Sequence, residues 1–167
     1  MATPTYTLID STTLTSSAGS ISFSGISGDY RDLVIVLTGK SVSSSEGNLV
    51  LRFNNDSGSN YNGVTAEADK NNNVSSANYS NYTNIYESLN DGNFSNSGLN
   101  QTIYQVMDYS QTDKHKTVLI RTGNAEYLGV AMGAGRWAST AAITSFIIYA
   151  GGDFASGSTV AVYGIVA

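Results

Sequence analysis

The sequence predicts an all-β fold, an antiparallel β-sandwich of jelly-roll-like type. Three observations favour it: apolar residues fall in short runs, turn-forming polar and glycine residues separate these runs, and no window has the period of an amphipathic helix. Of the 167 residues, 41% are hydrophobic and 13% are charged, which is typical of a chain with a buried core. The length fits a single domain over residues 1–167.

The first half of the chain contains four predicted strands. Residues 5–10 (TYTLID) and 20–26 (SISFSGI) alternate apolar and polar side chains, as half-buried strands do. Residues 32–40 (DLVIVLTGK) are apolar in successive positions, so we expect this strand to be covered on both faces. Residues 48–54 (NLVLRFN) alternate again and predict a strand with one buried face.

The second half repeats this pattern around a polar turn. Residues 102–110 (TIYQVMDYS) and 116–123 (KTVLIRTG) predict two strands on either side of that turn. Residues 126–138 (EYLGVAMGAGRWA) are strand-like but rich in glycine and alanine. Small residues in a strand indicate a bulge or the close approach of another backbone.

The last two apolar runs, residues 143–150 and 159–166, are separated by the polar segment GGDFASGS. This spacing predicts a β-hairpin with a long loop. Both runs are apolar on both faces, so we expect loops or another copy of the chain to cover their outer sides. The final strand is therefore expected to lie inside a sheet, with a neighbour on each side.

Between residues 54 and 101 the apolar pattern gives way to Asn, Ser, Gly and Tyr, and we expect a long polar insert without regular structure. This mixture resembles that of antibody binding loops, in which tyrosine supplies rigid contact area. Two interpretations stay open. The insert is a recognition surface, or its tyrosines pack on their own scaffold. The candidate recognition residues are Tyr61, Tyr79, Tyr82 and Tyr86.

The sequence offers few groups for chemistry. It has no cysteine and one histidine, which excludes disulfides and sites built on two histidines. His115 lies in a charged turn (TDKHKT) and is expected to be solvated. The segment NNDSGSNYNG lacks the acidic residues of a calcium loop, so a tight turn at Asp56 and Gly58 is expected instead. We therefore predict no catalytic residue, no metal, no cofactor and no enzymatic activity.

The charge balance also limits the partners. Eight Lys and Arg stand against 13 Asp and Glu, giving a net charge of −5, which argues against nucleic acid and anionic membranes as partners. The N-terminal residues lack the features of a signal peptide, and no apolar run is long enough to span a bilayer. We expect the chain to fold in a cytosol.

Four segments, residues 30–41 (YRDLVIVLTGKS), 51–61 (LRFNNDSGSNY), 113–123 (DKHKTVLIRTG) and 135–165, resemble small virion structural proteins of tailed phages, common among marine and cyanobacterial phages. The resemblance covers most of the chain except the tyrosine-rich insert. It implies a protein of the phage particle, assembled in the host cytoplasm, that carries no catalytic residues. Such proteins are capsid decoration (cement) proteins, head fibres, or modules of tails and tail fibres.

We therefore expect a capsid decoration protein that binds the major capsid protein or another virion protein as a homotrimer. The candidate interface residues are Arg136, Trp137, Tyr149 and Tyr163, because Arg and aromatic side chains are frequent at binding hot spots. For Trp137 a place in the core is the alternative. The alternative function is a tail-associated receptor-binding module that holds host glycans with the insert tyrosines.

Overall fold

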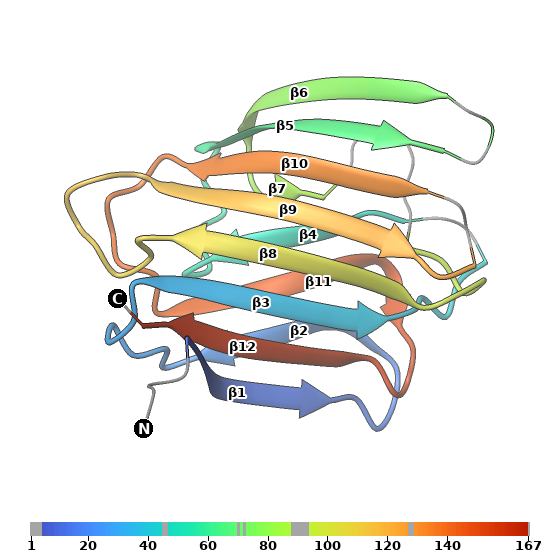
Figure 1. Ribbon diagram of the computed structural model, residues 1–167, viewed down its shortest axis with the longest axis horizontal. Coiled ribbons are helices and arrows are strands. Elements are labelled where there is room, and N and C mark those ends of the chain that lie inside the picture. The colour runs from blue at the N-terminus through green and yellow to red at the C-terminus, as the bar shows by residue number, and fades with distance from the viewer. Residues whose placement is uncertain are drawn as a thin grey trace.

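The computed structural model confirms the all-β, jelly-roll-like antiparallel sandwich (Figure 1). The structure describes residues 5–44, 47–69, 71, 73–87, 94–126 and 129–166. The strands in this part of the chain are β1 (Tyr6–Thr13), β2 (Ala18–Ser24), β3 (Asp32–Gly39), β4 (Leu49–Phe53), β5 (Tyr61–Ala68), β6 (Val74–Tyr82), β7 (Ile85–Tyr86), β8 (Asn100–Met107), β9 (Lys116–Asn124), β10 (Val130–Trp137), β11 (Ser145–Phe154) and β12 (Thr159–Ile165).

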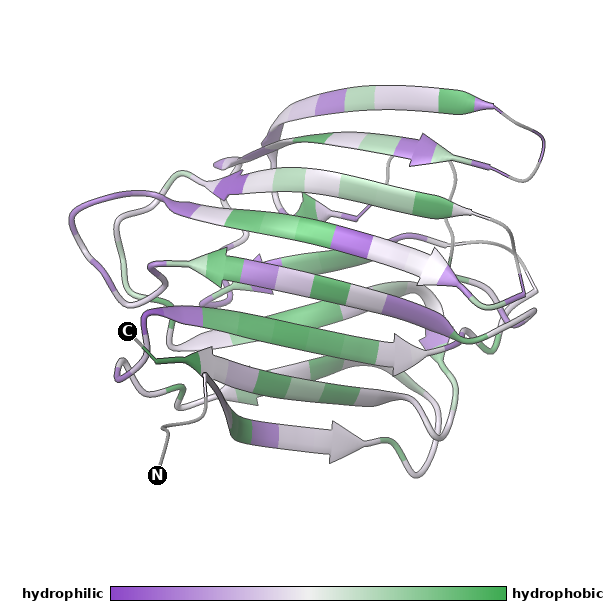
Figure 2. Cartoon of the chain, in the orientation of Figure 1, coloured by the Kyte–Doolittle hydropathy of each residue, from purple (hydrophilic) through white to green (hydrophobic). Residues whose placement is uncertain are grey.

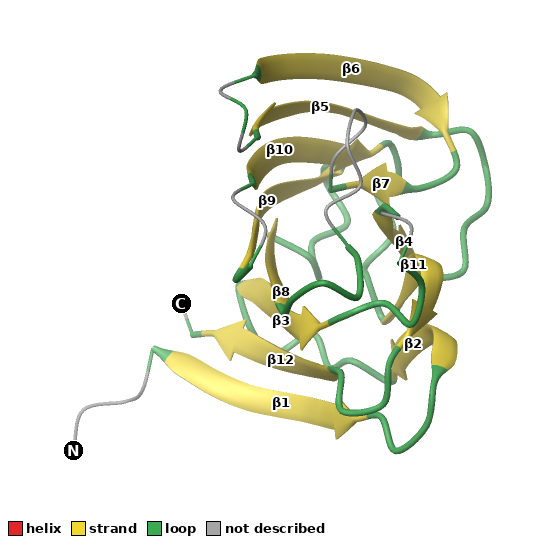
Figure 3. Ribbon diagram, turned by 90° about the vertical axis from the view of Figure 1, so that its right-hand side faces the viewer, coloured by secondary structure: helices red, strands yellow, loops and turns green. Residues whose placement is uncertain are grey.

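The strands form two sheets that lie face to face (Figure 3). The larger sheet has eight strands in the order β1-β12-β3-β8-β9-β10-β5-β6, and the smaller has four in the order β2-β11-β4-β7. Every pair of neighbours is antiparallel. No helix in the described residues is long and apolar enough to cross a membrane.

The core fills the space between the sheets. Leu33, Ile35 and Leu37 of β3 point into it and are fully buried, as are Leu51 and Phe53 of β4 in the opposite sheet. Burying an aliphatic side chain of this size contributes about 1.5–3 kcal/mol. The apolar run of β3 appears as a continuous green band in Figure 2, and its outward Val34 is also buried, as the two-sided pattern predicts.

The final strand lies inside a sheet, as expected, but the predicted closing hairpin is wrong. β12 pairs with β1 and β3 in the larger sheet, whereas β11 pairs with β2 and β4 in the smaller one. The segment between β11 and β12 therefore crosses from one sheet to the other. The local sequence pattern cannot distinguish this crossing from a hairpin, because each joins two apolar strand-like runs through a polar loop.

The expectation that residues 54–101 lack regular structure is also wrong for the described part. This region contains β5, β6, β7 and the first residues of β8. The inward positions of β5 and β6 hold residues such as Gly63, Thr65 and Ser75, which give no apolar alternation. Pairing in the larger sheet and the burial of Tyr61 and Tyr79 hold these strands, although their sequences lack a regular apolar alternation.

The glycine-rich segment before Trp137 confirms the predicted close approach. Gly135 of β10 faces inward, and a Cβ atom there would lie 2.7 Å from Cγ2 of Ile85 in β7. At Gly133 a Cβ atom would lie 2.9 Å from the carbonyl oxygen of Val64. The two glycines therefore let the smaller sheet and the neighbouring strand approach β10 closely.

Candidate functional site

Two of the four candidate recognition tyrosines lie in the interior. Tyr61 is fully buried and Tyr79 is 5% exposed. The Tyr61 hydroxyl donates to the carbonyl oxygen of Asp56 at 3.1 Å and accepts from the N–H of Phe53 at 3.2 Å. Burial raises the pKa of Tyr61 and of Tyr79 to about 12 each. Both side chains pack on their own scaffold and are not free to contact a ligand.

The other two tyrosines join Tyr79 in a cluster where β6 meets β7. The ring centroids of Tyr79 lie 5.2 Å from Tyr82 and 5.8 Å from Tyr86, and those of Tyr82 and Tyr86 lie 5.4 Å apart. The Tyr79 hydroxyl accepts from the N–H of Tyr86 at 3.1 Å. The pairing of β5 with β6 shifts register between Tyr79 and Tyr82, where Asn81 has a φ of 61°. With this shift, Tyr82 lies against Tyr79. Tyr82 is 40% exposed and gives the cluster an accessible edge.

Trp137 is a core residue. It is 2% exposed, its ring stacks on Tyr61, and its indole N–H donates to Oδ2 of Asp56 at 2.7 Å. Asp56 also accepts from the N–H of Gly58, so the predicted tight turn is present. Burial raises the pKa of Asp56, but its hydrogen bonds, the strongest from Asn60, outweigh this and lower it. The interface role expected for Trp137 is therefore not supported by its position.

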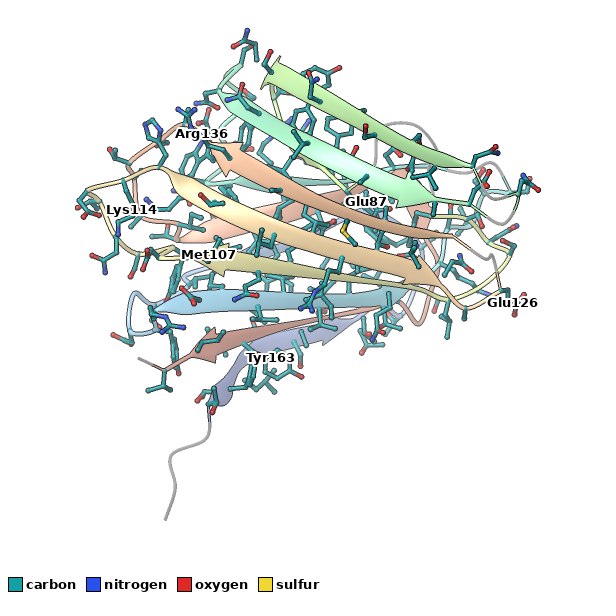
Figure 4. The ribbon with its side chains drawn as sticks, turned by 45° about the horizontal axis from the view of Figure 1, so that its top comes forward. Glu87, Met107, Lys114, Glu126, Arg136 and Tyr163 are labelled. Carbon is teal, nitrogen blue, oxygen red and sulfur yellow. The ribbon has the colours of Figure 1, made fainter. Side chains whose placement is uncertain are left out.

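The remaining interface candidates do not form one patch. Arg136 lies at the end of β10 and Tyr163 lies on β12, far apart on the larger sheet (Figure 4). Tyr149 belongs to β11 in the other sheet, where the Arg52 guanidinium lies 5.3 Å from its ring centroid. His115, expected to be solvated, is exposed but contacts Nη2 of Arg136 through Nδ1 at 2.8 Å.

The outer surface of the larger sheet carries an accessible hollow, which the sequence reasoning missed. A hollow of about 710 Å³ lies over β8, β9, β10, β5 and β6. Exposed aliphatic side chains border it: Val64 is 55% exposed, Leu119 44% and Met132 61%. Val130, on the same strand and face as Met132, is 59% exposed. We call this surface the outer face.

A second hollow of about 400 Å³ continues the first. It shares Val64, Asn78 and Ala134 with the larger hollow and reaches Arg136. Arg121 lines the larger hollow, so each of the two carries one guanidinium. Among the described residues, no carboxylate lines either hollow. The outer face is thus apolar and locally cationic on a chain of net charge −5.

A buried carboxyl group lies on the opposite, inner side of the larger sheet. Glu87 follows β7, is fully buried, and its Oε2 accepts from the Thr102 hydroxyl at 3.0 Å. Thr102 also contacts the Thr122 hydroxyl at 2.8 Å and Oδ1 of Asn100 at 2.9 Å. Burial raises the pKa of Glu87 to about 8, so this carboxyl is mainly protonated at neutral pH. Its interior position makes it a structural group.

The described residues contain no cluster of three or more His, Asp or Glu side chains placed to hold a metal ion. The outer face itself supplies aliphatic groups, amides, hydroxyls and two guanidinium groups. Such a surface can bind an apolar partner and orient an acidic group on it.

No protein-family model matches the chain, and no curated protein matches it. Among solved structures, an exo-inulinase from Aspergillus awamori is 12% identical with a TM-score of 0.48, over 96% of this chain but 29% of the inulinase. The alginate lyase Aly36B is 10% identical with a TM-score of 0.34, over 90% of this chain and 78% of the lyase. An alginate lyase from Aplysia kurodai is 10% identical with a TM-score of 0.31, over 84% of this chain and 71% of that chain. Likenesses this weak carry no argument about function.

Proposed function

We propose that the protein is a non-enzymatic structural component of a phage particle, a capsid decoration protein that binds the shell through its outer face. The observation that carries the proposal is the group of exposed aliphatic side chains, Val64, Leu119, Val130 and Met132, on one side of one sheet. Exposed apolar groups gathered beside a hollow mark interaction sites. The resemblance of the strand segments to small phage virion proteins favours a shell protein as the binding partner.

The charges of the outer face favour an acidic partner over a second copy of the same face. Arg121 and Arg136 line the two hollows, so two such faces brought together would set guanidinium groups against each other. A shell surface with apolar side chains and carboxylates would instead be complementary. We expect binding to weaken as salt rises, because salt screens these charge pairs.

The test is co-sedimentation of the purified protein with shells that lack it. Met132→Glu places a carboxylate within the aliphatic border of the hollow and should weaken binding at least tenfold, because the charge must be desolvated on contact. Ser22→Glu, at an exposed position of β2 in the other sheet, is the matched control and should bind as the natural protein does. Equal binding by the Met132 variant and the natural protein would refute the outer face as the contact surface.

The alternative function, a tail-associated module that binds host glycans, is favoured by the accessible edge of the tyrosine cluster. Tyr82 is partly exposed beside Tyr86, and aromatic rings of this kind can pack on a sugar. A glycan array probed with the natural protein and with Tyr82→Ala separates the functions. Glycan binding that Tyr82→Ala abolishes supports the module, and an array without signal supports decoration. The homotrimer is an expectation from the sequence alone, and the mass of the assembly in solution tests it against other oligomeric states.

A further inference from the structure

Strand β6 is an open edge of the larger sheet. In the part of the chain that the structure describes, β6 pairs with β5 on one side and with no strand on the other (Figure 1). Its sequence, VSSANYSNY, contains no charged residue and no proline. Open edges are sites where a further strand can add, and natural proteins block them with charges, proline, bulges or short strands. β6 has none of these over residues 74–79, which pair with β5 without a break.

The other sheet edges are shorter, more interrupted or charged. β1 carries Asp10 and a register shift between Leu8 and Asp10. β7 has two residues. β2 pairs with β11 without a break only over residues 20–24, and its register shifts between Ser20 and Ala18. Among the edges in the described structure, β6 is therefore the one best suited to accept another strand.

We propose that β6 of one copy pairs antiparallel with β6 of a second copy, joining the two larger sheets into one continuous sheet. A second copy is the fitting occupant because residues 74–80 carry no charge, so two copies of a chain with net charge −5 can meet at this edge without repulsion between its side chains. An antiparallel pairing of two identical strands has a two-fold axis, so each residue of β6 finds a defined residue of the other β6. The inference concerns this edge and does not depend on the proposed function.

Two observations determine the register of the proposed pairing: the face of the sheet to which each side chain of β6 points, and the residue at which the extended part of β6 ends. Paired residues in antiparallel strands point to the same face of the sheet, and side chains alternate between the faces along a strand. A residue of β6 can therefore pair only with a residue an even number of positions away. The two-fold axis then lies beside a residue that pairs with its own copy, not between two successive residues. Residues 74–80 are extended, whereas Asn81 has a φ of 61° and ends the extension. Centring the axis on Ala77 pairs this whole segment with its copy. Val74 then lies opposite Ser80, and Ser76 lies opposite Asn78.

Two copies of the chain that meet at β6 avoid the charge repulsion expected when they approach through other surfaces. Each copy has a net charge of −5, so most approaches of two copies are opposed. None of residues 74–80 is charged, and Ala77 at the axis has a small side chain. The new backbone hydrogen bonds would each contribute about 0.5–1.5 kcal/mol. Ser76 and Asn78 also line the larger hollow, so the hollows of both copies would open on the same side of the joined sheet.

A single cysteine tests the register directly, because the natural chain has none. Ala77→Cys places two cysteines on the axis with Cα atoms about 4.5–5.5 Å apart, within the range for a disulfide. Mild oxidation should convert this variant to a covalent dimer, seen on a non-reducing gel. Val74→Cys would set its two sulfur-bearing residues roughly 20 Å apart and should stay monomeric on that gel. Ser11→Cys on β1 and Ser22→Cys on β2 are matched controls for the other edges.

The proposal is overturned if Ala77→Cys oxidises to dimer no faster than these controls, or if a control on another edge is the one that cross-links. Circular dichroism and thermal unfolding of each variant show that it is folded before its cross-linking is compared.

A charge exchange provides a second, reversible measurement. Sedimentation of the natural protein should give the mass of two chains. Ser76→Lys with Asn78→Lys sets lysines opposite each other and should raise the dissociation constant at least tenfold. Ser76→Lys with Asn78→Glu sets opposite charges together and should restore the dimer. A natural protein that sediments as one chain, or as the three chains expected from the sequence, would contradict the pairing, as would equal behaviour of the two double variants.

Discussion

Glu87 is an acidic residue in a fully buried environment. Its carboxyl is enclosed between the two sheets, and Thr102 is the hydroxyl group that contacts it. With a pKa near 8 in the folded state against 4.5 for the free side chain, Glu87 binds more protons when folded than when unfolded. Its protonated form can donate to the Thr102 oxygen, which leaves the Thr102 hydroxyl proton free for Asn100.

This proton difference predicts a pH dependence of stability. Below pH 4.5 both states are protonated and Glu87 contributes no pH dependence. Between about pH 4.5 and pH 8 the unfolded state loses its proton first, so the free energy of unfolding should fall by roughly 1.4 kcal/mol per pH unit from this group. Glu87→Gln keeps the shape and a donor for Thr102, and should remove this slope and be the more stable protein at pH 8.

Denaturant unfolding of both proteins from pH 4 to pH 9 measures the effect. Asp153→Asn, which changes an exposed carboxylate, is the control and should leave the slope in place. If Glu87→Gln has the same pH profile as the natural protein, the carboxyl does not hold a proton in the folded state.

The sequence could predict the residue types of the site but not their positions. The tyrosines of the insert were identified as a group, yet Tyr61 and Tyr79 are buried and Tyr82 is exposed. Their burial depends on the Phe53 and Trp137 rings and on Gly63, which are distant in the sequence or give no apolar signal. A single sequence holds no information on such contacts before the strands are paired.

At the scale of elements, most strands could be predicted because their alternation is local. The strands β3, β4, β9 and β12 coincide with apolar runs that the sequence shows directly. The polar β5 and β6 could not be found in this way. The partners of β11 and β12 depend on the order of strands in the sheets, which the local pattern does not contain. The outer face was missed for the same reason, since Val64, Leu119 and Met132 converge only once β9, β10 and β5 are neighbours.

The close packing of β10 against β7 predicts that Gly135 cannot be enlarged without cost. Gly135→Ala would place a methyl carbon 2.7 Å from Cγ2 of Ile85, so the strands must separate. We expect the free energy of unfolding to fall by about 1–3 kcal/mol. Gly123→Ala on β9 is the control, since the nearest atom to its Cβ position lies 3.9 Å away.

Chemical denaturation of the two variants and the natural protein gives the comparison. Because the clash involves Ile85, Gly135→Ala should lower the free energy of unfolding by less when Ile85 is also changed to Ala. A Gly135→Ala protein as stable as the Gly123→Ala control would contradict the close approach of β7.

At the scale of the whole molecule, the inner faces of the two sheets and the outer face of the larger sheet have different roles. Their inner faces make the core, while the outer face of the larger sheet supplies the apolar hollow and its free edge supplies β6. A pair of chains joined at β6 would present two outer faces to a shell at once. Two simultaneous contacts raise the effective affinity well above that of one, provided both sites can be reached together.

The central claim is that this protein sits on a capsid with its outer face against the shell, and imaging of the intact particle tests it most directly. A cryo-electron microscopy map should show density for this chain on the outside of the capsid, with Val64, Leu119 and Met132 turned towards the shell surface. Density for the chain on the tail instead, or on the capsid with the same side chains facing solvent, would contradict the account.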